Sequence, residues 1–186
     1  MNENFFRIKN TLCLNDPMEY KASFDTLTKV ITAGVIILFI VIGMRSVKAL
    51  LNAQGDIVIL LIHWGILLFL VGTLTVCYAL SIRGYVIENN ELVIKRQFGE
   101  RRISIPVISE IRLVGEGDMT GTIRTFGNGG FFGYYGKYYN KTFGSMTLYT
   151  TQKANRVFIR TKKGDKVIIS PDDLSMVDAL KPGKSM

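Results

Sequence analysis

The sequence has few of the residues that build disulfide frameworks and transition-metal sites. Its 186 residues include two cysteines, Cys13 and Cys77, and a single histidine, His63. Cys13 stands in a polar N-terminal segment and Cys77 in a long apolar run, so we expect no disulfide between them. No CxxC pair and no second histidine is present to complete a zinc site. We therefore expect neither a disulfide scaffold nor a metal cluster, and we predict no cofactor.

Motifs of nucleotide binding and catalysis are also missing. A glycine-rich tract does not fit G-x-G-x-x-G, because the position of its third glycine holds Phe132. It does not fit a P-loop either, since Gly136-Lys137 is followed by tyrosine. The paired carboxylates Asp172 and Asp173 are explained by the start of a helix, and no nucleophile stands beside a base. We predict that the protein is not an enzyme.

Long apolar runs are what the sequence has in abundance. Residues 27–44 read LTKVITAGVIILFIVIGM and residues 57–82 read IVILLIHWGILLFLVGTLTVCYALSI, with Lys29 as their only charge. Roughly 17 to 25 apolar residues cross a bilayer. A cleaved signal peptide or a buried core helix could give such runs, but the polar, partly acidic segment 1–26 precedes the first one. We predict two transmembrane helices.

Basic residues near the spans suggest how the chain is oriented. The connecting loop 45–56 has two of them, Arg45 and Lys48. The flanking segments have five close to the spans, namely Lys21, Lys29, Arg83, Lys95 and Arg96. Because short cytoplasmic segments carry the excess of Lys and Arg, we expect both chain ends to be cytoplasmic and the loop to be extracytoplasmic.

Beyond residue 83 the hydrophobic pattern changes to the period of two that is typical of strands. We expect strands at residues 85–88, 92–97, 101–106, 108–114, 146–151, 156–161 and 166–170. Asn89-Asn90 and Phe98-Gly99 suit the bends of the first hairpins, and the sequence KKGD suits the last one.

The chain then shows helix start and stop signals. Ser170 is expected to cap a helix that begins at Pro171 and stops at Pro182-Gly183. Its apolar face would hold Leu174, Val177 and Leu180. The predicted fold class is mainly β: two N-terminal transmembrane helices followed by a cytoplasmic domain, residues 83–186, with a seven-stranded antiparallel barrel or sandwich closed by a C-terminal helix.

Residues 83–180 contain three distinctive motifs: YVIENNELVIKRQFGERRI at 85–103, RTFGNGGFFGYYG at 124–136 and ISPDD at 169–173. These motifs resemble those of bacterial pleckstrin-homology-like (PH-like) domains of small membrane proteins. The segment SFDTLTKVITAGV at 23–35 is also similar to the way in which such proteins enter their first span. The resemblance implies a PH-like fold anchored in the bacterial inner (cytoplasmic) membrane. It implies no assigned activity and no binding residues.

The glycine-aromatic motif is the most specific part of this resemblance. Residues 126–144 contain six glycines and eight aromatics, so a helix would be costly and we expect a loop or distorted hairpin. The tract either packs against its own barrel or exposes a surface for lipid or a partner. Its candidate residues are Arg124, Phe131, Phe132, Tyr134, Tyr135, Lys137, Tyr138 and Tyr139.

A second candidate site is a basic hairpin. Residues 83–186 carry seventeen Lys and Arg against ten Asp and Glu. Four of the basic residues bracket the turn at 97–100: Lys95, Arg96, Arg101 and Arg102. If the first strand runs away from the bilayer, the next one returns and brings this turn beside anionic headgroups. The alternative is a solvated hairpin; nucleic acid is not expected as a partner of a domain tethered to a membrane.

These features predict a non-enzymatic binding or assembly module at the cytoplasmic membrane surface. Its partner would be a lipid headgroup, a protein or another copy of the chain. The alternative is an accessory subunit of a transporter or envelope complex that contributes its transmembrane helices. Gly65, Gly72 and Ala79 recur every seven residues, which would let a helix approach closely. That helix is either the first span of the same chain or part of a partner.

Overall fold

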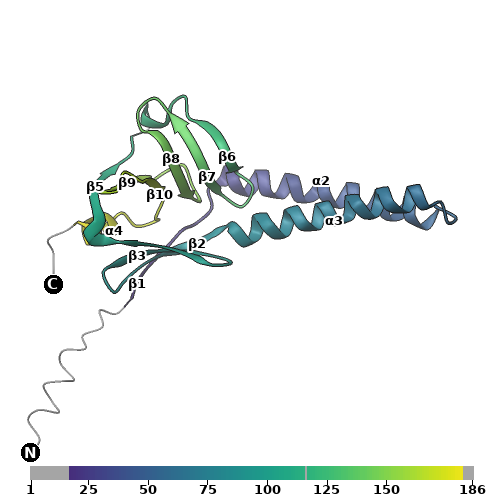
Figure 1. The fold of residues 1–186 in the computed structure, drawn as a ribbon, viewed down its shortest axis with the longest axis horizontal. Coiled ribbons are helices and arrows are strands. Elements are labelled where there is room, and N and C mark those ends of the chain that lie inside the picture. The colour runs from purple at the N-terminus through teal and green to yellow at the C-terminus, as the bar shows by residue number, and fades with distance from the viewer. Residues whose placement is uncertain (1–16, 116, 182–186) are drawn as a thin grey trace, which may run out of the picture.

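The computed structural model describes residues 17–115 and 117–181. Two long helices lie side by side and a β-rich domain sits at one end of them (Figure 1). Cys13 and the expected helix stop at Pro182-Gly183 lie outside the described residues.

The helix pair consists of α2, Thr26–Leu51, and α3, Ile57–Leu80. Each begins at an aspartate whose carboxylate accepts hydrogen bonds from first-turn amides: Asp25 from Thr28, and Asp56 from Val58 and Ile59. Both helices are long and apolar enough to cross a membrane, and almost none of their most apolar residues is buried in the chain. Core helices would be covered, so this is a membrane protein.

Helix α2 ends later than expected. It continues for seven residues past Met44, through the segment RSVKALL, because the sequence holds no helix breaker before Asn52. The backbone amide of Asn52 then caps the helix by donating to the carbonyls of its last turn.

The first sheet has four strands in the order β1-β2-β3-β4. Their bounds are β1 Met18–Lys21, β2 Ile82–Glu88, β3 Glu91–Arg96 and β4 Glu100–Ser104. Asn89 and Asn90 both have positive φ, 49° and 62°, as a two-residue hairpin turn requires. Strand β1 was not expected from the sequence; it lies before α2 and pairs antiparallel with β2, which directly follows α3.

The second sheet has six strands in the order β5-β9-β10-β8-β7-β6. Their bounds are β5 Ile108–Leu113, β6 Ile123–Gly129, β7 Tyr134–Asn140, β8 Gly144–Thr150, β9 Val157–Thr161 and β10 Lys166–Ile169. The expectation of seven antiparallel strands for the domain was wrong in two respects. The described part of the domain after α3 forms nine strands, β2 to β10, because the glycine-aromatic tract adds β6 and β7. In addition, β10 turns back from β9 and inserts between β9 and β8, so it pairs parallel to β8. Both sheets are open, so a closed barrel is not shown.

The main core lies between the two sheets, and α4, Ser175–Leu180, closes one end of it (Figure 1). The helix starts later than predicted, and Ser170 does not cap it. Ser170 Oγ instead accepts a 2.9 Å hydrogen bond from the amide of Thr151. Ser170 is thus held at the end of β10, where it is fully buried. Met176 and Leu180 are fully buried, whereas Leu174 is partly exposed.

One tyrosine joins the two sheets. Tyr85 on β2 donates from its hydroxyl to the carbonyl of Tyr149 at 2.7 Å and accepts from the amide of Ser170 at 3.0 Å. Its side chain is completely buried, and this burial raises the pKa of Tyr85 well above its usual range.

Candidate functional site

The glycine-aromatic tract forms a hairpin of β6 and β7 joined by residues 130–133. Gly127 and Gly136 lie opposite each other in this hairpin with φ of 123° and 122°. A Cβ on either glycine would overlap the backbone of the opposite strand, at Tyr135 or Phe126 respectively. The two strands therefore approach so closely here that only glycine fits both positions.

The tip of this hairpin packs against both long helices. The Phe131 ring contacts Phe39 of α2 edge to face, with ring centroids 6.3 Å apart. The Phe132 ring contacts Tyr78 of α3 in the same way at 5.7 Å. In addition, the amide of Phe132 donates to Thr32 Oγ1 at 3.0 Å. The tip is thus held by α2 and α3, a contact that the sequence did not indicate.

The tyrosines of β7 alternate between the two faces of the six-stranded sheet. Tyr134 and Tyr138 are buried in a cluster on the outer face, together with Met146, Leu148 and Phe158. Tyr135 is buried in the core between the sheets, and its hydroxyl donates to the carbonyl of Cys77 in α3 at 2.9 Å. Burial raises the pKa of Tyr135, so this phenol stays protonated. Tyr139 is half exposed.

The four candidate basic residues divide between the two faces of the first sheet. Arg102 faces outward and forms ion pairs with Glu88, Glu91 and Glu100 at 3.3, 3.4 and 2.7 Å. These partners raise the pKa of Arg102. Lys95 pairs with Glu19 of β1 at 3.2 Å. The charges of Arg102 and Lys95 are therefore largely matched by carboxylates within the same sheet.

Arg96 and Arg101 lie on the opposite, inner face. Arg101 is directly across from the buried Ile94 in the β3–β4 ladder, and residues facing each other in this way share a side of the sheet. Arg96, two residues after Ile94, lies on the same side and places its guanidinium 5.0 Å from the centre of the Tyr149 ring. Both arginines are thus directed toward the second sheet.

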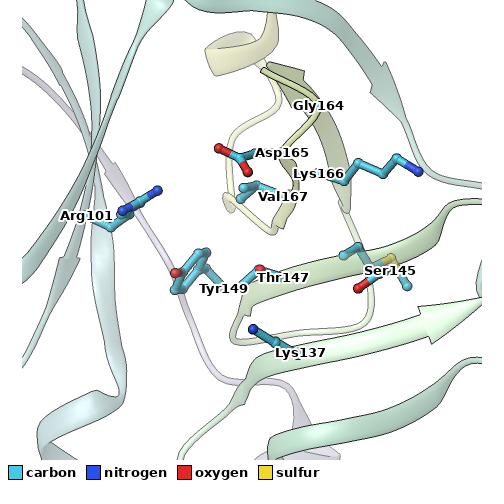
Figure 2. A pocket seen from close by; sticks show the side chains of 10 residues that line it. Arg101, Lys137, Ser145, Thr147, Tyr149, Gly164, Asp165, Lys166 and Val167 are labelled. Atoms are coloured by element: carbon cyan, nitrogen blue, oxygen red, sulfur yellow. The ribbon is translucent and has the colours of Figure 1, made fainter. Parts of the chain in front are cut away.

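An open cleft of about 310 Å³ lies between the sheets at this point. Figure 2 shows Arg101 entering from one sheet and Lys137, on β7, from the other. Asp165 is the one carboxylate among the lining residues. Lys166 also lines the cleft, but its Nζ points away and donates to the carbonyl of Phe143 at 2.6 Å. The cleft therefore has more positive than negative charge.

A smaller, more apolar cleft of about 170 Å³ lies next to the first, and Thr147 and Tyr149 line both clefts. It is lined by Leu80, the last residue of α3, and by Phe126 of β6, with Arg96 beside them. The two clefts together extend from the end of the helix pair, where the walls are apolar, to the cationic space around Arg101 and Lys137. This geometry suits an amphiphile with an anionic group.

The structure brings together only some residues of the two predicted sites, the basic hairpin and the glycine-aromatic tract. Arg101 and Lys137, one from each set, line the same cleft, whereas Arg102 and Lys95 face away from it. Arg124 lies along β6, next to Gly129. In the described part of the chain no group of three His, Cys, Asp or Glu side chains is arranged as a metal site.

Comparison with known protein families matches part of the chain. The model of the bacterial PH domain family matches residues 83–182. No curated protein and no solved structure matches the chain. The matched segment covers more than half of the chain and contains β3 to β10, α4, all of β2 except its first residue, and every residue that lines the larger cleft. The chain therefore belongs to the bacterial PH domain family and is a membrane protein that carries such a domain.

Proposed function

We propose that the protein is a non-catalytic binding module, anchored by α2 and α3, that takes the anionic headgroup of a membrane lipid into the cleft between its sheets. The observation that carries this proposal is the convergence of Arg101 and Lys137 from different sheets. Neither side chain forms an ion pair or hydrogen bond with any residue that the structure describes. Their partner is therefore proposed to come from outside the chain.

The chemistry of the walls favours a lipid over a free anion. Guanidinium and ammonium groups bind phosphate oxygens by charge-assisted hydrogen bonds. The apolar walls at Leu80 and Phe126 lie toward the end of α3, so acyl chains would stay at the bilayer while the headgroup enters the cleft. Both chain ends are proposed to face the cytoplasm, which makes this a lipid of the cytoplasmic leaflet.

Lipid retention by the full-length protein tests the proposal. The protein is purified in mild detergent from membranes that contain phosphatidylglycerol and phosphatidylethanolamine, and bound lipid is measured by native mass spectrometry. We expect the wild type and R102Q to retain phosphatidylglycerol, because Arg102 is matched by carboxylates outside the cleft. We expect the double variant R101Q/K137Q to lose most of it. Equal retention in the double variant and R102Q would contradict the proposal.

A second candidate function, an accessory subunit of a membrane complex, is favoured by a different observation. A Cβ added at Gly65 or Gly72 would meet no atom within 4 Å. Helix α2 therefore does not pack closely on this stripe, which leaves it available to another helix. Purification of the full protein with a stoichiometric membrane partner, lost in G65L/G72L, would support this function; purification of the chain alone would not.

A further inference from the structure

The bend between β3 and β4 is fixed to the end of α3 by two backbone hydrogen bonds. The amide of Phe98 donates to the carbonyl of Ala79 at 2.9 Å, and the amide of Gln97 donates to that of Ser81 at 3.0 Å. Carbonyls in the last turn of a helix have no partner within the helix, so this bend supplies one. The position of Phe98 along the axis of α3 is therefore set by the fold.

Phe98 nevertheless leaves its ring almost uncovered. The residue is 81% exposed, and Phe126 on β6 is 79% exposed. Phe98 lies in the bend between β3 and β4, and Phe126 lies in β6 of the other sheet. Both are nevertheless next to the last residues of α3: the amide of Phe98 donates to the carbonyl of Ala79, and Phe126 lines a cleft together with Leu80. In Figure 1 the β3–β4 and β6–β7 hairpins both point along the helix pair, away from the rest of the domain.

The length of α3 indicates that Phe98 and Phe126 lie at the membrane surface. Its 24 residues extend for about 36 Å at 1.5 Å per residue, compared with about 30 Å of hydrocarbon and 40 to 45 Å including headgroups. Ala79 and Leu80, at its end, then lie in the headgroup region or just below it. Two large apolar rings at this depth are unfavourable in water but well placed to enter acyl chains.

From this geometry we infer that Phe98 and Phe126 insert into the bilayer beside α3, so that the domain rests on the membrane at two points in addition to its two helices. The partner is the lipid surface that α2 and α3 cross. Phe126 also lines the apolar cleft together with Leu80, so its insertion would hold this wall of the cleft at the headgroups. This contact uses apolar side chains and so requires no anionic lipid.

Depth-dependent fluorescence quenching tests the inference in full-length protein. The chain has a single tryptophan, so W64F removes the background, and F98W or F126W then introduces one reporter at a time. Each variant is placed in nanodiscs of zwitterionic phosphatidylcholine with or without brominated acyl chains. The control reporter is L113W, because Leu113 is also exposed and lies in β5, which is not part of either hairpin.

We expect F98W and F126W to emit at shorter wavelength than L113W and to lose most of their emission in brominated nanodiscs. L113W should keep nearly all of its emission. If either reporter is quenched no more than L113W, the insertion of both rings is contradicted. Because only zwitterionic lipid is used, this result does not depend on whether the cleft binds an anionic headgroup.

Discussion

The backbone amide of Phe132 donates a hydrogen bond to the side-chain oxygen of Thr32, far earlier in the chain, at 3.0 Å. Thr32 belongs to α2, and Phe132 lies in the tip of the β6–β7 hairpin. The domain is thus attached to the helix pair by side-chain packing and hydrogen bonds as well as by its covalent link. The glycine-aromatic motif makes this attachment, which gives a physical reason for its unusual composition.

Removing one ring from this attachment should destabilise the protein. F131A deletes a buried ring that contacts Phe39, and such truncations cost roughly 3 kcal/mol. We expect the full-length protein in detergent to melt several degrees lower. The matched control is I123A, an apolar truncation at a 65% exposed site on the same hairpin, which should change the melting temperature little. Equal effects of the two variants would contradict the proposed role of the tip.

β6 and β7 lie so close together at Gly127 and Gly136 that adding one methyl group at either position should disrupt the hairpin. In G136A, the new Cβ would overlap the carbonyl of Phe126, and the residue would have to keep a φ of 122°. Such backbone strain alone costs on the order of 1 to 3 kcal/mol. We expect poor folding yield or rapid proteolysis of the hairpin. G117A is the control, because a Cβ there meets open space and should leave both properties unchanged.

Tyr85 should make stability depend on alkaline pH. Its pKa is raised in the folded protein above the ordinary value of 10.0, so the fold favours the protonated phenol. This contribution is complete below pH 10 and is lost as pH rises further, because the unfolded chain then releases the proton. In Y85F the melting temperature should be lower at pH 8, since the Ser170 amide loses its acceptor, but should fall less steeply between pH 9 and 11. An unchanged slope would show that other groups, such as Tyr135, determine this dependence.

The orientation of the chain can be tested by thiol labelling. In a background without Cys13 and Cys77, we expect N52C, at the turn between α2 and α3, to react with an impermeant reagent in intact cells. K163C, in the β9–β10 turn, should react only after the membrane is opened. The reverse labelling pattern would place the domain outside the cytoplasm.

Local features of the fold could be predicted because a few neighbouring residues determine them. The Asn89-Asn90 turn needs two residues that tolerate positive φ, and Gly164 in the KKGD turn has a φ of 90°. The two helices followed from length and hydropathy alone. Strand β1 and the parallel β8–β10 pair could not be predicted in this way, because their partners are distant in the chain and no short pattern specifies them.

The candidate site shows the same limit. Alternation along β4 puts Arg101 on the side of the apolar Ile103 and Arg102 on the opposite side, so the faces of these two arginines could be predicted from the sequence. Lys137 and Arg101 both stood out in the sequence as parts of separate motifs. Their meeting in one cleft depends on how the two sheets pack, which no local pattern encodes.

The pairing of β1 with β2 also constrains how the protein is made. Met18 pairs with Ile87, so the ladder closes a long loop that contains both helices. During synthesis β1 leaves the ribosome first, but its partner strand does not exist until α3 has been completed. The four-stranded sheet can therefore form only after both helices have been translated. Helix α3 must also have crossed the membrane back to the side on which β1 lies. A chain whose α3 failed to integrate would leave β1 without a partner.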